Sequence, residues 1–158
     1  NAAGYRAIAT GFEAGASADY AIAIGESSVV GGLAAVGVGS AARAGGEQAA
    51  AFGYSANASN DSAVAIGSFA EASGLFSTAM GASSIASANA SVAIGAGAST
   101  ASPNAASLGT SVAIGNLSSA SDEDAVAMGD KARASWLINA AYAADWQQFQ
   151  NEGFVKPR

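Results

Sequence analysis

A short acidic cluster is the part of the sequence that most suggests a metal ion. Asp122, Glu123 and Asp124 are consecutive, and Asp130 follows six residues after Asp124. Carboxylate oxygens are the ligands that calcium prefers, so these four residues are candidates for a weak calcium site. A solvated turn explains the same cluster more simply, and the glycine-rich nonapeptide repeat that binds calcium in other proteins is absent. We therefore expect no bound metal and no other cofactor.

Residues that usually carry catalysis are scarce. The chain has no histidine and no cysteine, so the commonest general base and the thiolate nucleophile or metal ligand are missing. Two glycine-rich segments, 37–39 and 95–97, superficially resemble phosphate-binding loops, but we expect a strand rather than a helix after each of them. The sequence predicts no catalytic residues, no cofactor-binding residues and no enzyme activity.

Composition excludes two further classes of partner. The net charge is −6 and only 11% of the residues are charged, so no basic stripe is present to neutralise the phosphates of a nucleic acid. The sequence has no run of about 18 apolar residues, and we expect no membrane contact by this part of the chain. Alanine, glycine and serine dominate, which leaves too few large apolar side chains for a conventional core.

The elements that must position any functional residue are set by an internal repeat. Glycine recurs every fourteen residues in two runs, which are Gly11, Gly25, Gly39, Gly53, Gly67, Gly81 and Gly95, and then Gly115 and Gly129. In the segment before each glycine, small and bulky residues alternate with period two, which is typical of a β-strand. Nine copies in phase predict that the chain stacks short coils into a parallel β-solenoid.

The bulky positions before each glycine form one face of this strand. They are Ile8, Ile22, Ile24, Val36, Val38, Phe52, Val64, Ile66, Met80, Val92, Ile94, Val112, Ile114, Val126 and Met128. The other face holds Ala, Ser or one Gly, and small residues recur three and five positions after each glycine. Each coil is therefore expected to contain two strands of about four or five residues around an interior too narrow for large side chains, with coils stacked about 4.8 Å apart.

The bulky face then has no place inside its own coil. It forms an apolar stripe larger than a soluble monomer usually exposes, and this predicts contact with other copies of the same chain. The alternative arrangement places the bulky residues inside and the alanines outside. It gives no reason for an outer face to exclude larger residues, so we favour the bulky stripe as the subunit interface.

Four positions after each glycine, no single residue type predominates. This outward column contains Gly15, Val29, Arg43, Asn57, Glu71, Ile85, Ser99, Ser119 and Arg133. Variation of this kind is typical of a solvent-facing surface, and binding specificity would depend on it and on the adjacent turns. We take Val29, Arg43, Asn57, Glu71, Ile85 and Arg133 as the candidate outer adhesive face.

Residues 91–95 and 111–115, both Ser-Val-Ala-Ile-Gly, carry a family resemblance. Together with the 14-residue period they resemble the head repeats of trimeric autotransporter adhesins, the YadA-like family, over residues 4–134. The resemblance implies a left-handed parallel β-roll that associates as a homotrimer through the bulky face. It also implies a head, anchored in the outer membrane through other parts of the protein, that attaches bacteria to host matrix proteins, to cell-surface receptors or to one another.

Two segments depart from the repeat. Gly95 and Gly115 are twenty residues apart, so we interpret residues 101–110 as an enlarged turn within a β-roll of residues 1–134. Residues 135–158 form a separate C-terminal segment, in which a helix from Ser135 to Asn151 is expected because Ile138, Tyr142 and Trp146 recur at helical spacing. This helix would cap the last coil; a ligand site built from Trp136, Tyr142 and Trp146 is the alternative.

Two functions remain open at this point. The sequence favours a non-enzymatic adhesin head, because it combines a repeat, a bulky stripe and a variable outer face. A stiff spacer rod that only presents another binding domain would explain the monotonous coils nearly as well. An ice-binding solenoid requires ranked threonines, which this chain lacks.

Overall fold

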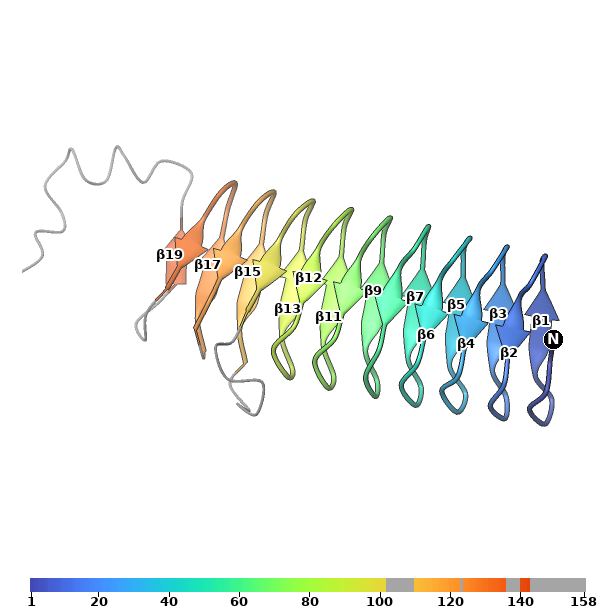
Figure 1. The fold of residues 1–158 in the computed structure, drawn as a ribbon. Coiled ribbons are helices and arrows are strands. Elements are labelled where there is room, and N and C mark those ends of the chain that lie inside the picture. The colour runs from blue at the N-terminus through green and yellow to red at the C-terminus, as the bar shows by residue number, and fades with distance from the viewer. Residues whose placement is uncertain (102–109, 123, 136–139, 143–158) are drawn as a thin grey trace, which may run out of the picture.

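The chain forms a rod of short coils stacked side by side (Figure 1). The computed structural model describes residues 1–101, 110–122, 124–135 and 140–142. Within these residues all regular structure is β, and every pairing between strands is parallel. No helix in the described part of the chain is long and apolar enough to cross a membrane.

The first sheet consists of strands of three residues, one from each coil. They are β1 (Ile8–Thr10), β3 (Ile22–Ile24), β5 (Val36–Val38), β7 (Ala50–Phe52), β9 (Val64–Ile66), β11 (Thr78–Met80), β13 (Val92–Ile94), β15 (Val112–Ile114), β17 (Val126–Met128) and β19 (Ala140–Tyr142). Except at the step from β13 to β15, each strand pairs with the next in a register of fourteen residues, as in Ile66 opposite Met80. These strands are shorter than the four or five residues expected.

The second sheet consists of strands of two residues on the opposite side of each coil. They are β2 (Gly15–Ala16), β4 (Val29–Val30), β6 (Arg43–Ala44), β8 (Asn57–Ala58), β10 (Glu71–Ala72), β12 (Ile85–Ala86), β14 (Ser99–Thr100), β16 (Ser119–Ala120) and β18 (Arg133–Ala134). The fold is therefore the all-β parallel solenoid with two strands per coil that the repeat predicts.

The interior confirms that the small residues point inward. The alanine columns are fully buried, as at Ala51, Ala65 and Ala79, whereas Ile66 beside them is partly exposed. Several of the serines buried among these alanines have a local acceptor for the hydroxyl. Ser77 Oγ, for example, donates to the carbonyl oxygen of Gly74 at 2.7 Å. The alternative with the bulky residues inside is wrong.

Val30 is the largest side chain that is fully buried in the described coils. Val30 is fully buried, and the facing residue in β5 is Gly37, where the other coils carry alanine. A Cβ added at Gly37 would lie 2.7 Å from Val30 Cγ2. Val30 therefore occupies the space that the methyl group of an alanine at position 37 would fill.

This complementarity predicts a reciprocal mutational effect. Gly37→Ala alone should lower the free energy of unfolding by about 1–3 kcal/mol, because it overpacks a close-packed interior. In a Val30→Ala background the same substitution should cost close to nothing, since it restores the pair of alanines found in neighbouring coils. Urea unfolding of the four proteins in a double-mutant cycle measures this coupling. Equal costs in the two backgrounds would contradict the assignment.

The coil between β13 and β15 contains the extra residues. Val92 pairs with Val112 and Ile94 with Ile114, so this step spans twenty residues whereas the steps around it span fourteen. This pairing matches the twenty-residue spacing of Gly95 and Gly115. Most of the enlarged turn expected at 101–110 lies outside the described residues.

The C-terminal helix expected over 135–151 is wrong where the structure describes that segment. Ala140–Tyr142 forms β19, with Ala141 opposite Ala127 and Tyr142 opposite Met128. Ala141 and Tyr142 correspond in sequence to the small and bulky positions of the repeat. The strand pairs with the edge of β17 that would otherwise be open. The rest of the expected helix, including Trp136 and Trp146, lies outside the described residues, and so does most of the alternative ligand site.

Candidate functional site

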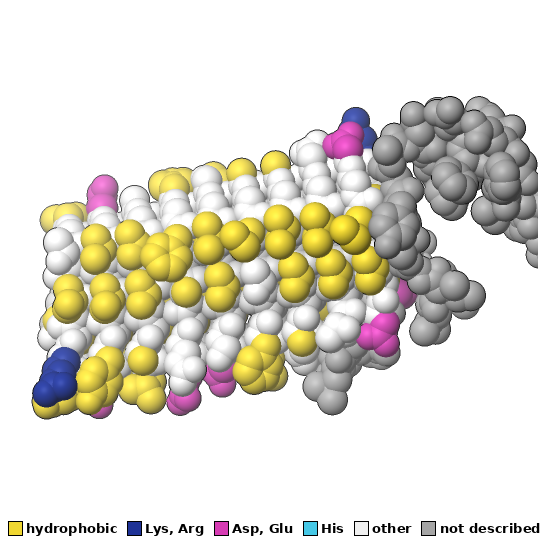
Figure 2. Space-filling view, turned by 180° about the vertical axis from the view of Figure 1, so that it is seen from behind, with side chains coloured by type: hydrophobic (Ala, Val, Ile, Leu, Met, Phe, Trp, Pro, Cys, Tyr) yellow, Lys and Arg dark blue, Asp and Glu magenta, His cyan; other side chains and the backbone are white. Residues whose placement is uncertain are grey.

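The first outer surface is the apolar face of the first sheet. Figure 2 shows two rows of mostly hydrophobic side chains along the rod, with charged residues at the edges of this face. The rows contain all of the bulky residues predicted for the subunit interface, and their side chains are exposed or half-buried: Ile8, Ile22, Ile24, Val36, Val38, Phe52, Val64, Ile66, Met80, Val92, Ile94, Val112, Ile114, Val126 and Met128. From β1 to β17, the rows are interrupted by smaller residues only at Thr10, Ala50 and Thr78. The role of the bulky residues in these rows as a subunit contact stays a prediction.

The second outer surface belongs to the second sheet. The variable column lies here as expected, with Val29, Arg43, Glu71, Ile85 and Arg133 exposed and Asn57 half-buried. The parallel register places Arg43 beside Asn57 and Asn57 beside Glu71. Arg43 and Glu71 are therefore two strands apart, or about 9.6 Å along the rod.

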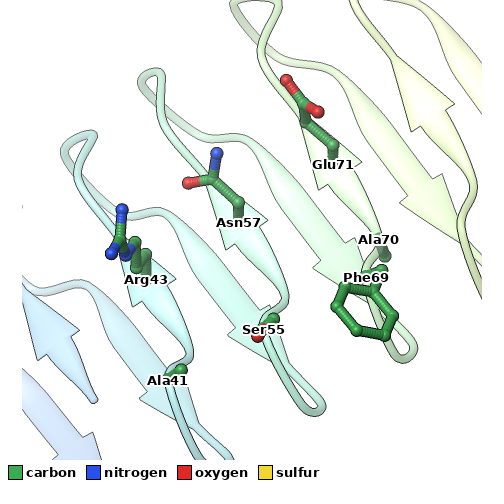
Figure 3. Close-up of a pocket in the computed structure, with 7 residues that line it drawn as sticks. All are labelled: Ala41, Arg43, Ser55, Asn57, Phe69, Ala70 and Glu71. Atoms are coloured by element: carbon green, nitrogen blue, oxygen red, sulfur yellow. The ribbon is translucent and has the colours of Figure 1, made fainter. Parts of the chain in front are cut away.

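Two shallow depressions flank this row of polar side chains. One, of about 400 Å³, is lined by Val29, Gly31, Arg43, Gly45, Asn57 and Ser59. The other, of about 370 Å³, is lined by Ala41, Arg43, Ser55, Asn57, Phe69, Ala70 and Glu71. Figure 3 shows Arg43, Asn57 and Glu71 on three successive strands, with Phe69 at the turn near the second depression. We call this second one the Phe69 depression.

Exposed aromatic residues at the turns were not predicted as part of the site. Tyr54 and Phe69 pack edge to face with ring centroids 5.2 Å apart, beside the Phe69 depression. Tyr5 and Tyr20 form a similar pair at the other edge, 5.8 Å apart, with the Arg6 guanidinium 5.1 Å from the Tyr5 ring. Comparison between coils would have revealed Tyr54 and Phe69, because most other coils carry small or polar residues at those positions.

The acidic residues considered for calcium do not come together. Asp124 accepts a hydrogen bond from the Thr110 backbone at 3.1 Å in one turn. Asp130 lies after β17, in the turn at the opposite edge, where it accepts one from Asn116 Nδ2 at 2.9 Å. Among the described residues, which exclude Glu123, no group of three acidic side chains could hold a metal ion. Asp124 and Asp130 instead accept hydrogen bonds from residues of the neighbouring coil.

Comparison with known proteins identifies the class of protein that this geometry defines. The family model for the YadA head domain repeat matches residues 2–28, 44–70, 72–98 and 109–132. A solved structure, the collagen-binding domain of the Yersinia adhesin YadA, is 32% identical with a TM-score of 0.74. The match covers 96% of this chain and 84% of that one. No curated protein sequence matches the chain.

The chain therefore belongs to the family of YadA head domain repeats. It is an adhesin head built as a β-solenoid, and heads of this kind are exposed at the bacterial surface. The family is a structural domain of adhesins and not a known family of enzymes.

Proposed function

We propose that this head assembles as a homotrimer and attaches bacteria to fibrous host matrix proteins of the collagen class. The observation that carries the proposal is the similarity, along nearly the whole chain, to a domain that binds collagen. The head is presented outside the cell and is anchored in the outer membrane through other parts of the protein. Binding to cell-surface receptors or to other heads are the alternatives within the same role.

The apolar face supports the proposed trimer. A rod whose side carries two rows of Val, Ile, Phe and Met exposes more apolar surface than monomeric proteins usually tolerate. Every coil contributes to the rows, so a partner must match the rod along its length, and another copy of the chain does so. Three parallel rods around one axis bury all three faces in a closed ring.

The second sheet supports the role in binding. With the first sheet turned toward the axis, the outer surface of the second sheet faces solvent on every subunit. Its variable column and two depressions are then presented three times. Multivalent presentation raises the apparent affinity for a fibrous ligand that repeats its own binding sites.

A solid-phase binding assay separates an adhesin from a spacer. The purified chain should bind immobilised native type I collagen saturably, with an apparent Kd of roughly 1 µM or below, or about −8 kcal/mol. Heat-denatured collagen on the same surface is the matched control, because it keeps the sequence and loses the triple helix. Fibronectin, laminin, cultured cells and the head itself complete the panel. Absence of binding throughout the panel would leave this chain as a spacer rod.

A further inference from the structure

Phe69 occupies a position that the fold gives no reason to make aromatic. Its backbone φ is 57°, in the left-handed region that bulky residues rarely adopt. Its side chain is 56% exposed, so it contributes little to the interior. In neighbouring coils the equivalent residues are Ser55 and Ser83, which serve the same turn. Phe69 therefore costs backbone energy without a matching gain from burial.

Tyr54 joins Phe69 in a rigid aromatic pair. The Phe69 backbone N–H donates to the carbonyl oxygen of Tyr54 at 2.9 Å, which fixes the two turns against each other. The rings meet edge to face at 84°, and Tyr54 is 55% exposed. Two exposed rings held by their backbones supply apolar contact area with little loss of side-chain entropy on binding.

The polar side chains around the Phe69 depression complement this pair. Arg43 presents a planar guanidinium with five donors, Asn57 an amide with donors and an acceptor, and Glu71 a carboxylate. The structure pairs none of the three with another side chain among the described residues. The depression is lined by these groups and by Phe69 on one side (Figure 3). It is shallow and open, which suits the side of a rod better than an enclosed small molecule.

A polyproline-type helix has the matching chemistry. Its imino-acid rings pack against exposed aromatic side chains, and its backbone carbonyls, which form no hydrogen bonds within the strand, accept from donors in the groove. We propose that Phe69 and Tyr54, with Arg43, Asn57 and Glu71, form the subsite for an imino-acid-rich strand of a collagen-like triple helix. The inference rests on the proposed function and locates its binding site.

The test compares two phenylalanines in the same conformation. Phe69→Asn removes the ring but keeps a residue that tolerates a positive φ. Phe76→Asn is the matched control, because Phe76 has a φ of 55° and is 65% exposed but lines neither depression. Binding of the full chain to a synthetic triple-helical Gly-Pro-Hyp peptide is measured by surface plasmon resonance, and thermal unfolding of each variant is checked alongside.

Phe69→Asn should weaken peptide binding about tenfold or more, as expected for an aromatic anchor, while Phe76→Asn leaves it unchanged. Arg43→Gln should also weaken binding, by a smaller factor. Unchanged binding by Phe69→Asn, or equal losses in both phenylalanine variants, would overturn the subsite and leave the adhesin function standing. Binding to glycosylated collagen but not to the unglycosylated peptide would overturn it in favour of a sugar site. If the unmodified head binds no collagen, the proposed function itself fails.

Discussion

Ile66→Asp is expected to convert the trimer that we propose into folded monomers. Ile66 lies at the middle of the apolar face, between Phe52 and Met80 on the adjacent strands. Its side chain is 37% exposed in the single chain, so an aspartate there can remain hydrated in a monomer. In a trimer the same carboxylate would be buried against two other apolar faces without a partner, which is strongly unfavourable. Sedimentation velocity distinguishes the two states.

Ile85 provides a matched control for this substitution. It is an isoleucine of similar exposure, 40%, but it lies on the outer surface of the second sheet. Ile85→Asp should leave the trimer intact, and circular dichroism should show the same β content for both variants. A trimer that survives Ile66→Asp but not Ile85→Asp would show that the subunits contact each other through the second sheet, contrary to our proposal. A native protein that is already monomeric would reject the contact altogether.

The columns of the repeat were sufficient to predict the fold because each has a single physical requirement. Alanine at Ala51, Ala65 and Ala79 is required by a narrow interior, and the bulky residues between them are excluded from it. Period two and period fourteen together leave two ways to orient the strands, and the exclusion of larger residues from the alanine column favoured the orientation that the structure has. The family resemblance rested on the same positions, and the match to the head repeats confirms it.

Contacts between residues that belong to different columns of the repeat could not be predicted in this way. Val30 and Gly37 are exceptions in two different columns, and only their proximity in space shows that one compensates for the other. The same limit applies to the contact between Tyr54 and Phe69. Each residue stands out in its own column, but the columns do not show that the two rings, fifteen residues apart, meet through stacked turns. Column analysis treats each position alone, so it finds the repeat and misses pairs that depart from it together.

The C-terminal segment shows a different limit. The spacing of Ile138 and Tyr142 fits one face of a helix, and Ala141 followed by Tyr142 also fits the strand of the repeat. Local pattern alone does not decide between the two, because a short apolar run is compatible with both. The open edge of β17 decides in favour of the strand for Ala140–Tyr142, since pairing satisfies backbone groups that a helix would leave exposed on that edge.

Two strands per coil require turns between them, but the sequence did not predict the conformation of these turns. A left-handed residue recurs every seven positions from Arg6 to Ala90, once in each turn, and none of these residues is glycine. Hydrogen bonds between the turns of successive coils offset the strain of this backbone conformation. The Ser83 backbone N–H, for example, donates to the carbonyl oxygen of Ser68 at 2.8 Å. The glycines that recur every fourteen residues, such as Gly67, stand instead where the backbone of the next coil leaves no room for a Cβ.

Gly67→Ala tests that distinction and should be the most damaging of the small substitutions. Gly67 has a φ of 131°, which L side chains rarely adopt, and a Cβ there would lie 2.5 Å from the carbonyl oxygen of Gly81. Backbone strain and the clash together should cost roughly 3 kcal/mol or more of the free energy of unfolding. The clash lies between two coils in the middle of the rod, so it should also weaken their coupling. Urea unfolding should show a lower midpoint and a broader transition.

Gly31→Ala is the control that separates this effect from the general cost of changing glycine. Gly31 is exposed, its φ is not in the left-handed region, and an added Cβ would meet nothing closer than Ser17 Oγ at 3.9 Å. Its substitution should change the free energy of unfolding by no more than about 0.5 kcal/mol. Similar losses in the two variants would show that glycine is retained every fourteen residues for some reason other than the approach of successive coils. A loss confined to Gly67→Ala would show that the close approach of one coil's backbone to the next is what requires glycine at this position of the repeat.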